Sequence, residues 1–135
     1  MNAQAICALL EATFNLPRDS MAPDTRLALQ LGTGMHLDLE VCDAEGELRL
    51  GARIGSPPRD TRDALLVGGL LANTVLAEYA DHHLAFHPEL DTLLLCQTLP
   101  TEPLTRDLLL LRLREFVTRA NAYQRRFIDE QAVCA

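Results

Sequence analysis

The sequence lacks the short motifs that mark a catalytic nucleophile or a phosphate-binding loop. G-x-S-x-G, the P-loop and G-x-G-x-x-G are all absent. The pair Gly32-x-Gly34 lacks a third glycine and joins two predicted strands instead of opening a helix. Because no motif supplies a reacting group, the sequence predicts a binding protein rather than an enzyme, with no cofactor.

Cysteines are few and scattered along the chain. They are Cys7, Cys42, Cys96 and Cys134. No two of them form the C-x-x-C pair that is typical of zinc and redox sites. We expect free thiols in a reducing compartment, most of them buried as small apolar side chains.

Lysine is absent, so all 12 basic residues are arginine, against 19 acidic residues and a net charge of -7. An acidic surface repels phosphate groups, which disfavours nucleic acids and anionic membranes as partners.

The longest apolar run, Ala64–Leu71, is far shorter than the roughly 20 residues of a membrane span. The first residues carry no basic region and include Glu11, unlike a secretion signal. We therefore expect a cytosolic protein.

Histidines and carboxylates offer two weak chemical alternatives. His82, His83 and His87 form the only histidine cluster, and alternation places His83 and His87 on one face of a predicted strand. A zinc site needs about three or four ligands, and no cysteine or carboxylate lies at a matching close spacing. Asp38 and Glu40 share a wet strand face with His36, which is ordinary in an acidic chain. The sequence predicts no catalytic residue and no metal ligand.

Five segments alternate between apolar and polar residues, the pattern of strands with one dry and one wet face. They are Arg26–Leu31, Met35–Cys42, Glu47–Ile54, His83–His87 and Thr92–Leu99. Hairpin turns are expected at Gly32-Thr33-Gly34 and at Asp43–Gly46. The pattern predicts an antiparallel sheet.

Helices are expected before, within and after these strands. The first covers Ala3–Phe14, and the last begins with Thr101 as its N-cap and Pro103 in its first turn, then runs to about Phe127. A third helix is expected over Ala64–Ala80. The order is α-β-β-β-α-β-β-α, which predicts a single α+β domain over residues 1–135 with helices packed on a twisted antiparallel sheet.

The segment Ala64–Ala80 is apolar around almost its whole circumference, whereas a helix on a monomer's surface shows one apolar stripe. A chain of 135 residues is too short to bury both faces, so a second copy is expected to cover one. The alternative is close packing on the protein's own sheet. The predicted homodimer interface is Ala64, Leu65, Gly68, Gly69, Ala72, Val75, Leu76 and Tyr79.

Over nearly its whole length the chain resembles the class I type III secretion chaperone family, also called the Tir-chaperone or CesT-like family, and the more specific part of the resemblance is the second half. The resemblance rests on LLVGGLLANTVLAEYADHHLAFHPELDTLLLCQTLPTEPL and on REFVTRANAYQRRF near the end. The closing helix of the family often carries tryptophan, which this chain lacks. The resemblance implies a cytoplasmic bacterial homodimer that holds the extended N-terminal segment of a secreted effector without ATP.

Candidate client-binding residues come from the first helix and the first strand. They are Ile6, Leu9, Leu10, Phe14, Leu29 and Leu31. The alternative is that these side chains only hold the first helix on the core. Three other functions stay open: a regulatory protein of the same fold that sequesters a secretion regulator or anti-activator, a small metal-binding enzyme, and a dimer without a peptide client.

Overall fold

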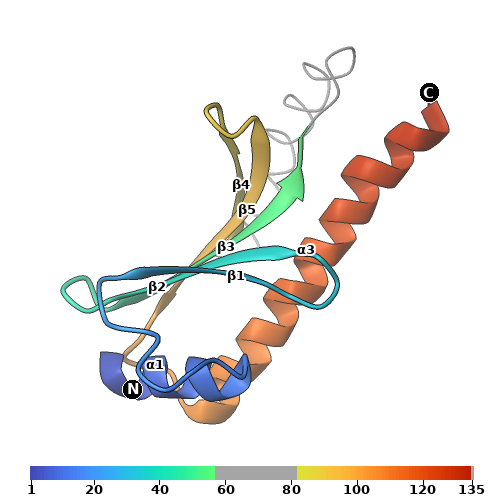
Figure 1. The fold of residues 1–135 in the computed structure, drawn as a ribbon. Coiled ribbons are helices and arrows are strands. Elements are labelled where there is room, and N and C mark those ends of the chain that lie inside the picture. Colours follow the sequence, from blue (N-terminus) through green and yellow to red (C-terminus); the bar gives the residue numbers. More distant parts are fainter. Residues whose placement is uncertain (57–81, 135) are drawn as a thin grey trace.

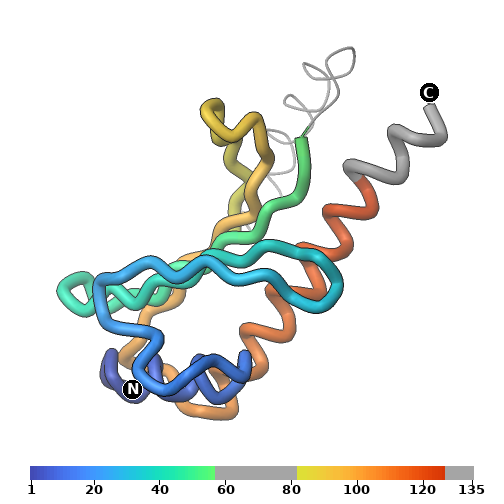
Figure 2. Tube along the Cα trace, in the orientation of Figure 1, coloured from blue at the N-terminus to red at the C-terminus, as the bar shows by residue number. Residues whose placement is uncertain are grey.

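The computed structural model describes residues 1–56 and 82–134, and the course of the chain is followed in Figure 2. Side chains are described as far as Arg126. Its centre is a five-stranded antiparallel sheet with the strand order β1-β2-β3-β5-β4 (Figure 1). The strands are β1 (Arg26–Gln30), β2 (His36–Cys42), β3 (Glu47–Gly55), β4 (His82–His87) and β5 (Thr92–Pro100). All five predicted strands and the α+β class are confirmed.

The pleat gives the sheet one apolar and one polar face. Leu39 pairs with Leu50, and Val41 pairs with Leu48, which in turn pairs with Leu99 on β5. These side chains are at most 5% exposed and belong to the hydrophobic core. The alternate residues of β2, from His36 to Glu40, are exposed or half-buried. The predicted inward and outward residues of β2 are therefore confirmed.

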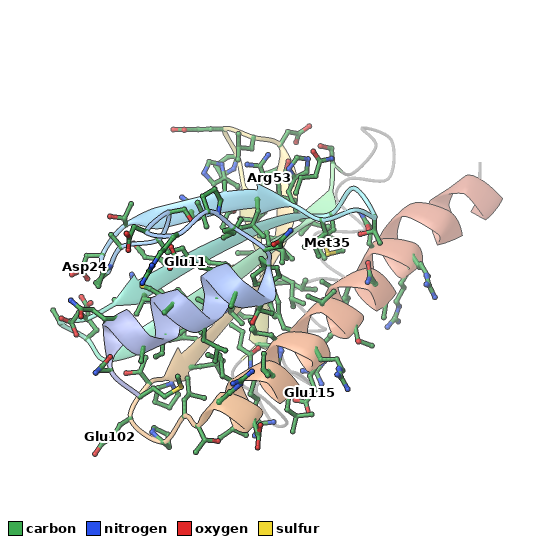
Figure 3. The ribbon with its side chains drawn as sticks, turned by 60° about the horizontal axis from the view of Figure 1, so that its bottom comes forward. Glu11, Asp24, Met35, Arg53, Glu102 and Glu115 are labelled. Carbon is green, nitrogen blue, oxygen red and sulfur yellow. The ribbon has the colours of Figure 1, made fainter. Side chains whose placement is uncertain are left out.

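Two helices, α1 (Ala3–Thr13) and α3 (Arg106–Cys134), lie on the apolar side of the sheet (Figure 3). Helix α1 begins at Asn2, whose Oδ1 accepts a hydrogen bond of 2.8 Å from the Ala5 amide. Helix α3 buries a stripe of residues at spacings of three and four. That stripe is Leu109, Leu113, Phe116 and Ala120. Both helices close one core, as the predicted apolar stripes require.

The start of α3 differs from its prediction. Thr105 is the N-cap, because its Oγ1 accepts from the Leu108 amide at 3.2 Å. Thr101, the predicted N-cap, instead closes a turn in which its carbonyl accepts from the Leu104 amide at 3.2 Å. Its own amide donates to the Gly46 carbonyl at 2.9 Å, which holds Thr101 at the end of the sheet. The predicted end near Phe127 is also wrong, since α3 continues to Cys134.

The predicted helix Ala64–Ala80 lies outside the described residues, as do all eight predicted interface residues, Ala64, Leu65, Gly68, Gly69, Ala72, Val75, Leu76 and Tyr79. The homodimer therefore stays a prediction. Among the described helices, none is both long and apolar enough to span a membrane.

Candidate functional site

Half-buried apolar side chains occur on α1, on the loop that follows it and along the edge strand β1. Six such side chains between residues 9 and 31 pack against the hydrophobic core without being covered by it. We call them the α1–β1 edge: Leu9, Phe14, Leu16, Leu27, Leu29 and Leu31. Partly exposed apolar area next to an edge strand is a surface suited to a protein partner.

The loop between α1 and β1 is fixed at both ends by carboxylates. Glu11 Oε2 accepts hydrogen bonds from the Met21 amide at 3.2 Å and the Ser20 hydroxyl at 3.4 Å. Asp24 Oδ1 accepts from the Asp43 amide at 3.0 Å. These bonds connect the loop to α1 and to the end of β2, and so hold the α1–β1 edge in place.

Within the part of the chain that the structure describes, β1 is the first strand in the sheet order and pairs only with β2, so its other side is open. The Leu31 amide donates to the Met35 carbonyl at 2.8 Å, across a turn in which Gly34 has a φ of 91°. Hydrogen-bonded and non-bonded pairs alternate along an antiparallel ladder. The backbone groups of Leu27 and Leu29 therefore face β2, and those of Ala28 and Gln30 face outward from the sheet.

The six predicted client-binding residues fall into two groups. Ile6 and Leu10 are both 0% exposed and belong to the core, so their side chains are not available to a partner in this structure. The other four are half-buried and belong to the α1–β1 edge: Leu9, Phe14, Leu29 and Leu31. Leu16 and Leu27 were not among the candidates, although the alternation of β1 already placed Leu27 beside Leu29.

The polar face of the sheet carries a shallow hollow of about 380 Å³ over β2, β3 and β5. Its charges are paired: Arg26 lies 3.3 Å from Asp38, and Arg49 lies 4.0 Å from Glu40. Cys96 borders the hollow, and burial raises the pKa of its thiol above the ordinary value of 9.0. Paired carboxylates and a protonated thiol do not form a catalytic set.

The histidines of β4 do not converge. His83 is exposed, and His87 Nδ1 accepts from the Leu90 amide at 3.2 Å. Within residues 1–56 and 82–126, no three histidine, cysteine or acidic side chains form a group that could hold a metal ion.

His82, to which the sequence analysis gave no role of its own, is only 4% exposed. The Arg119 Nη1 atom lies 2.9 Å from His82 Nδ1, and the imidazole stacks on Phe116 with ring centroids 6.1 Å apart. This polar contact joins β4 to α3 inside the protein. Strand alternation could have located it, since one of two adjacent histidines must face the core.

Comparison with known proteins identifies the family. The family model described as "Tir chaperone protein (CesT) family" matches residues 6–124. This chain belongs to the CesT family. The resemblance seen in the sequence is confirmed, and the match includes the whole α1–β1 edge. No curated protein sequence matches at a significant level.

Solved structures share the fold at low sequence identity. A chain of the ExsC–ExsE complex has a TM-score of 0.75 and 17% identity over 94% of this chain and 97% of its own length. The HopA1–SchA chaperone–effector complex has a TM-score of 0.67 and 14% identity, with coverage of 90% and 91%. The Yersinia pestis type III secretion chaperone SycH, in complex with a fragment of YscM2, has a TM-score of 0.66 and 17% identity, with coverage of 90% and 99%.

Proposed function

We propose that this chain is a type III secretion chaperone that binds the extended N-terminal segment of an effector at the α1–β1 edge. The observation that carries the proposal is the open side of β1, where outward-facing backbone groups lie beside six half-buried apolar side chains. Family membership supports the same function. The chain acts as a binding protein rather than an enzyme, in the bacterial cytoplasm and without ATP.

Strand addition is the mode of binding that this geometry favours. An extended segment laid along β1 pairs its backbone with the outward groups of Ala28 and Gln30, which gives affinity without fixing the client sequence. Every second client side chain then lies over the apolar face beside Leu27 and Leu29. Ordering a long client segment costs several kcal/mol, and the apolar area of the α1–β1 edge offsets part of that cost.

Known complexes of the same fold support this proposal. The HopA1–SchA structure is a chaperone–effector complex, and SycH is bound to a stable fragment of another protein. We infer that this chain likewise works with a protein partner.

The proposed chaperone is a homodimer that pairs through the segment Ala64–Ala80. With a chain mass of 14.9 kDa, sedimentation should report a particle of about 30 kDa. Gly68→Leu places a large side chain on the predicted helix contact, and should give a folded monomer with unchanged helix content. A folded Gly68→Leu protein that remains a dimer contradicts the predicted interface.

The function is tested by the pair Ala28→Pro and Ala28→Val. Proline removes only the outward N–H of an edge strand, where proline is tolerated, whereas valine keeps it. The tagged protein is purified from its own bacterium, its partner is identified by mass spectrometry, and affinities are measured by calorimetry. We expect an exported effector bound through its N-terminal segment, with affinity at least tenfold weaker for Ala28→Pro and little changed for Ala28→Val.

Two results would contradict this proposal. A partner that controls secretion and is not exported would assign the chain to the regulatory alternative. Full affinity in a folded Ala28→Pro protein would exclude strand addition at β1.

A further inference from the structure

Arginines are concentrated on α3 although the protein as a whole is acidic. Between Arg106 and Arg126 the helix carries six arginines and two acidic residues, whereas the whole chain has 12 basic and 19 acidic residues. This helix is therefore a basic element in an acidic protein. The side of α3 turned away from the strands carries Glu115, labelled in Figure 3.

Five of these six arginines form two rows along α3. Arg114 and Arg125 are exposed and, eleven residues apart, lie on nearly the same helical line. The second row has a spacing of seven residues and consists of Arg112, Arg119 and Arg126. Between the rows lie Leu111, Thr118 and Ala122, together with Glu115, whose carboxylate is paired with Arg112. Leu111 is 47% exposed.

A shallow hollow of about 390 Å³ lies between these rows. It is lined by Arg114, Glu115, Thr118, Arg119 and Ala122. The long arginine side chains form its sides, and the short side chains of Thr118 and Ala122 form its floor. A partner's backbone can approach the helix closely there while its side chains reach both rows.

Much of this positive charge is not neutralised by the residues whose side chains the structure describes. Arg112 pairs with Glu115 at 3.0 Å, and Arg119 is held by His82. Arg114, Arg125 and Arg126 form no ion pair with another residue of the part that the structure describes. Since all three are exposed, their charge is available to a partner.

We propose that the outer side of α3 docks an acidic segment of a second partner protein, separate from the α1–β1 edge. Guanidinium groups recognise carboxylates through paired hydrogen bonds, so carboxylates on one side of the segment fit the two rows. One apolar side chain of the segment packs on Leu111. A protein partner fits better than a nucleic acid, because no aromatic side chain on which a base could stack lies between the rows. This inference does not depend on the proposed function.

The test uses a fluorescein-labelled helical peptide of about 15 residues, with glutamates at i, i+3 and i+4 and one leucine. Binding to the full chain is followed by fluorescence anisotropy at low salt. We expect saturable binding that weakens as salt rises. Arg114→Glu/Arg125→Glu should weaken binding at least tenfold and Arg114→Glu alone several-fold, with unchanged circular dichroism. The matched control Arg18→Glu, which reverses another exposed arginine, should stay within twofold.

Four results overturn the proposal: no binding of the peptide, equal binding of a peptide with glutamine in place of glutamate, an equal loss in Arg18→Glu, or tighter binding of single-stranded RNA of similar length. The Ala28→Pro variant separates this site from the client site. It should keep full peptide affinity even if client binding at β1 is lost.

Discussion

Helices α1 and α3 pack on the same side of one sheet but expose different chemistry. The outward residues of α1 are neutral, and they are Gln4, Ala5, Ala8, Ala12 and Thr13. Arginine is the commonest outward residue of α3, and Arg114 and Arg125 are both exposed. Both helices contribute equally apolar inner stripes to the core.

The inner sides of the two helices stabilise the fold, whereas their outer sides are available for recognition of partners. The inner stripes need only shape and apolar area, so they resemble each other. The outer sides are free to differ: α1 presents an uncharged surface beside an open strand, and α3 presents positive charge. A single small chain can therefore provide two separate surfaces, one for an extended apolar segment and one for an acidic segment.

The largest effect is expected at the boundary between the inner and outer sides of α1. Leu10 is 0% exposed, whereas its neighbour Leu9 is half-buried. Leu10→Asp buries an unpaired carboxylate and should cost more than about 4 kcal/mol, enough to unfold the protein. Leu9→Asp should leave it folded but weaken client binding. Thermal unfolding followed by circular dichroism distinguishes the Leu10→Asp variant from the Leu9→Asp variant. Comparable melting temperatures of both variants would contradict the assignment of Leu10 to the core and Leu9 to the binding surface.

The next effect compares a leucine on strand β1 with a leucine on the outer side of α3. Leu29→Ala, in the α1–β1 edge, should weaken client affinity about tenfold through lost apolar contact, or about 1.4 kcal/mol. Leu111→Ala, on the outer side of α3, should leave client affinity within twofold. Calorimetry with the co-purified client measures both. A larger loss for Leu111→Ala would move the client site to α3.

A smaller effect concerns the start of α3. Thr105→Ala removes the N-cap oxygen and should lower the free energy of unfolding by about 1 kcal/mol. Thr101→Ala keeps the N-cap, and we expect a clearly smaller loss. Urea titration measures both variants, and a larger loss for Thr101→Ala would restore the N-cap predicted from the sequence.

The smallest effect is on alkaline stability, and it sharpens the contrast between the polar face of the sheet and the core. Burial raises the pKa of the Cys96 thiol above its ordinary value of 9.0. As pH rises, the Cys96 thiol therefore ionises in the unfolded chain before it ionises in the native protein. Its contribution to the free energy of unfolding is fully present below pH 9 and is lost as pH rises through the native pKa. The urea midpoint of Cys96→Ala should fall less between pH 7 and pH 10 than that of the wild type. An equal fall would show that this thiol is not shielded.

The sheet was predictable because period-two alternation and turn residues decide strands locally. The buried residues Leu37, Leu39 and Leu48 all followed from that pattern. The N-cap of α3 was not predictable, because a long-range bond from Thr101 to Gly46 decides it. Apolar spacing on α1 likewise could not tell Leu10 from Leu9, since that depends on how closely α1 packs on β2. The family resemblance was readable from the second half of the chain, but the open side of β1 required the strand order.

The most direct test of client binding is hydrogen–deuterium exchange of the protein with and without its co-purified client. The account predicts that the outward amides of Ala28 and Gln30 exchange quickly in the free protein and slow markedly in the complex. The amides of Leu27 and Leu29, already bonded to β2, should change much less. Unchanged exchange at Ala28 and Gln30 in a saturated complex would contradict binding at the open side of β1.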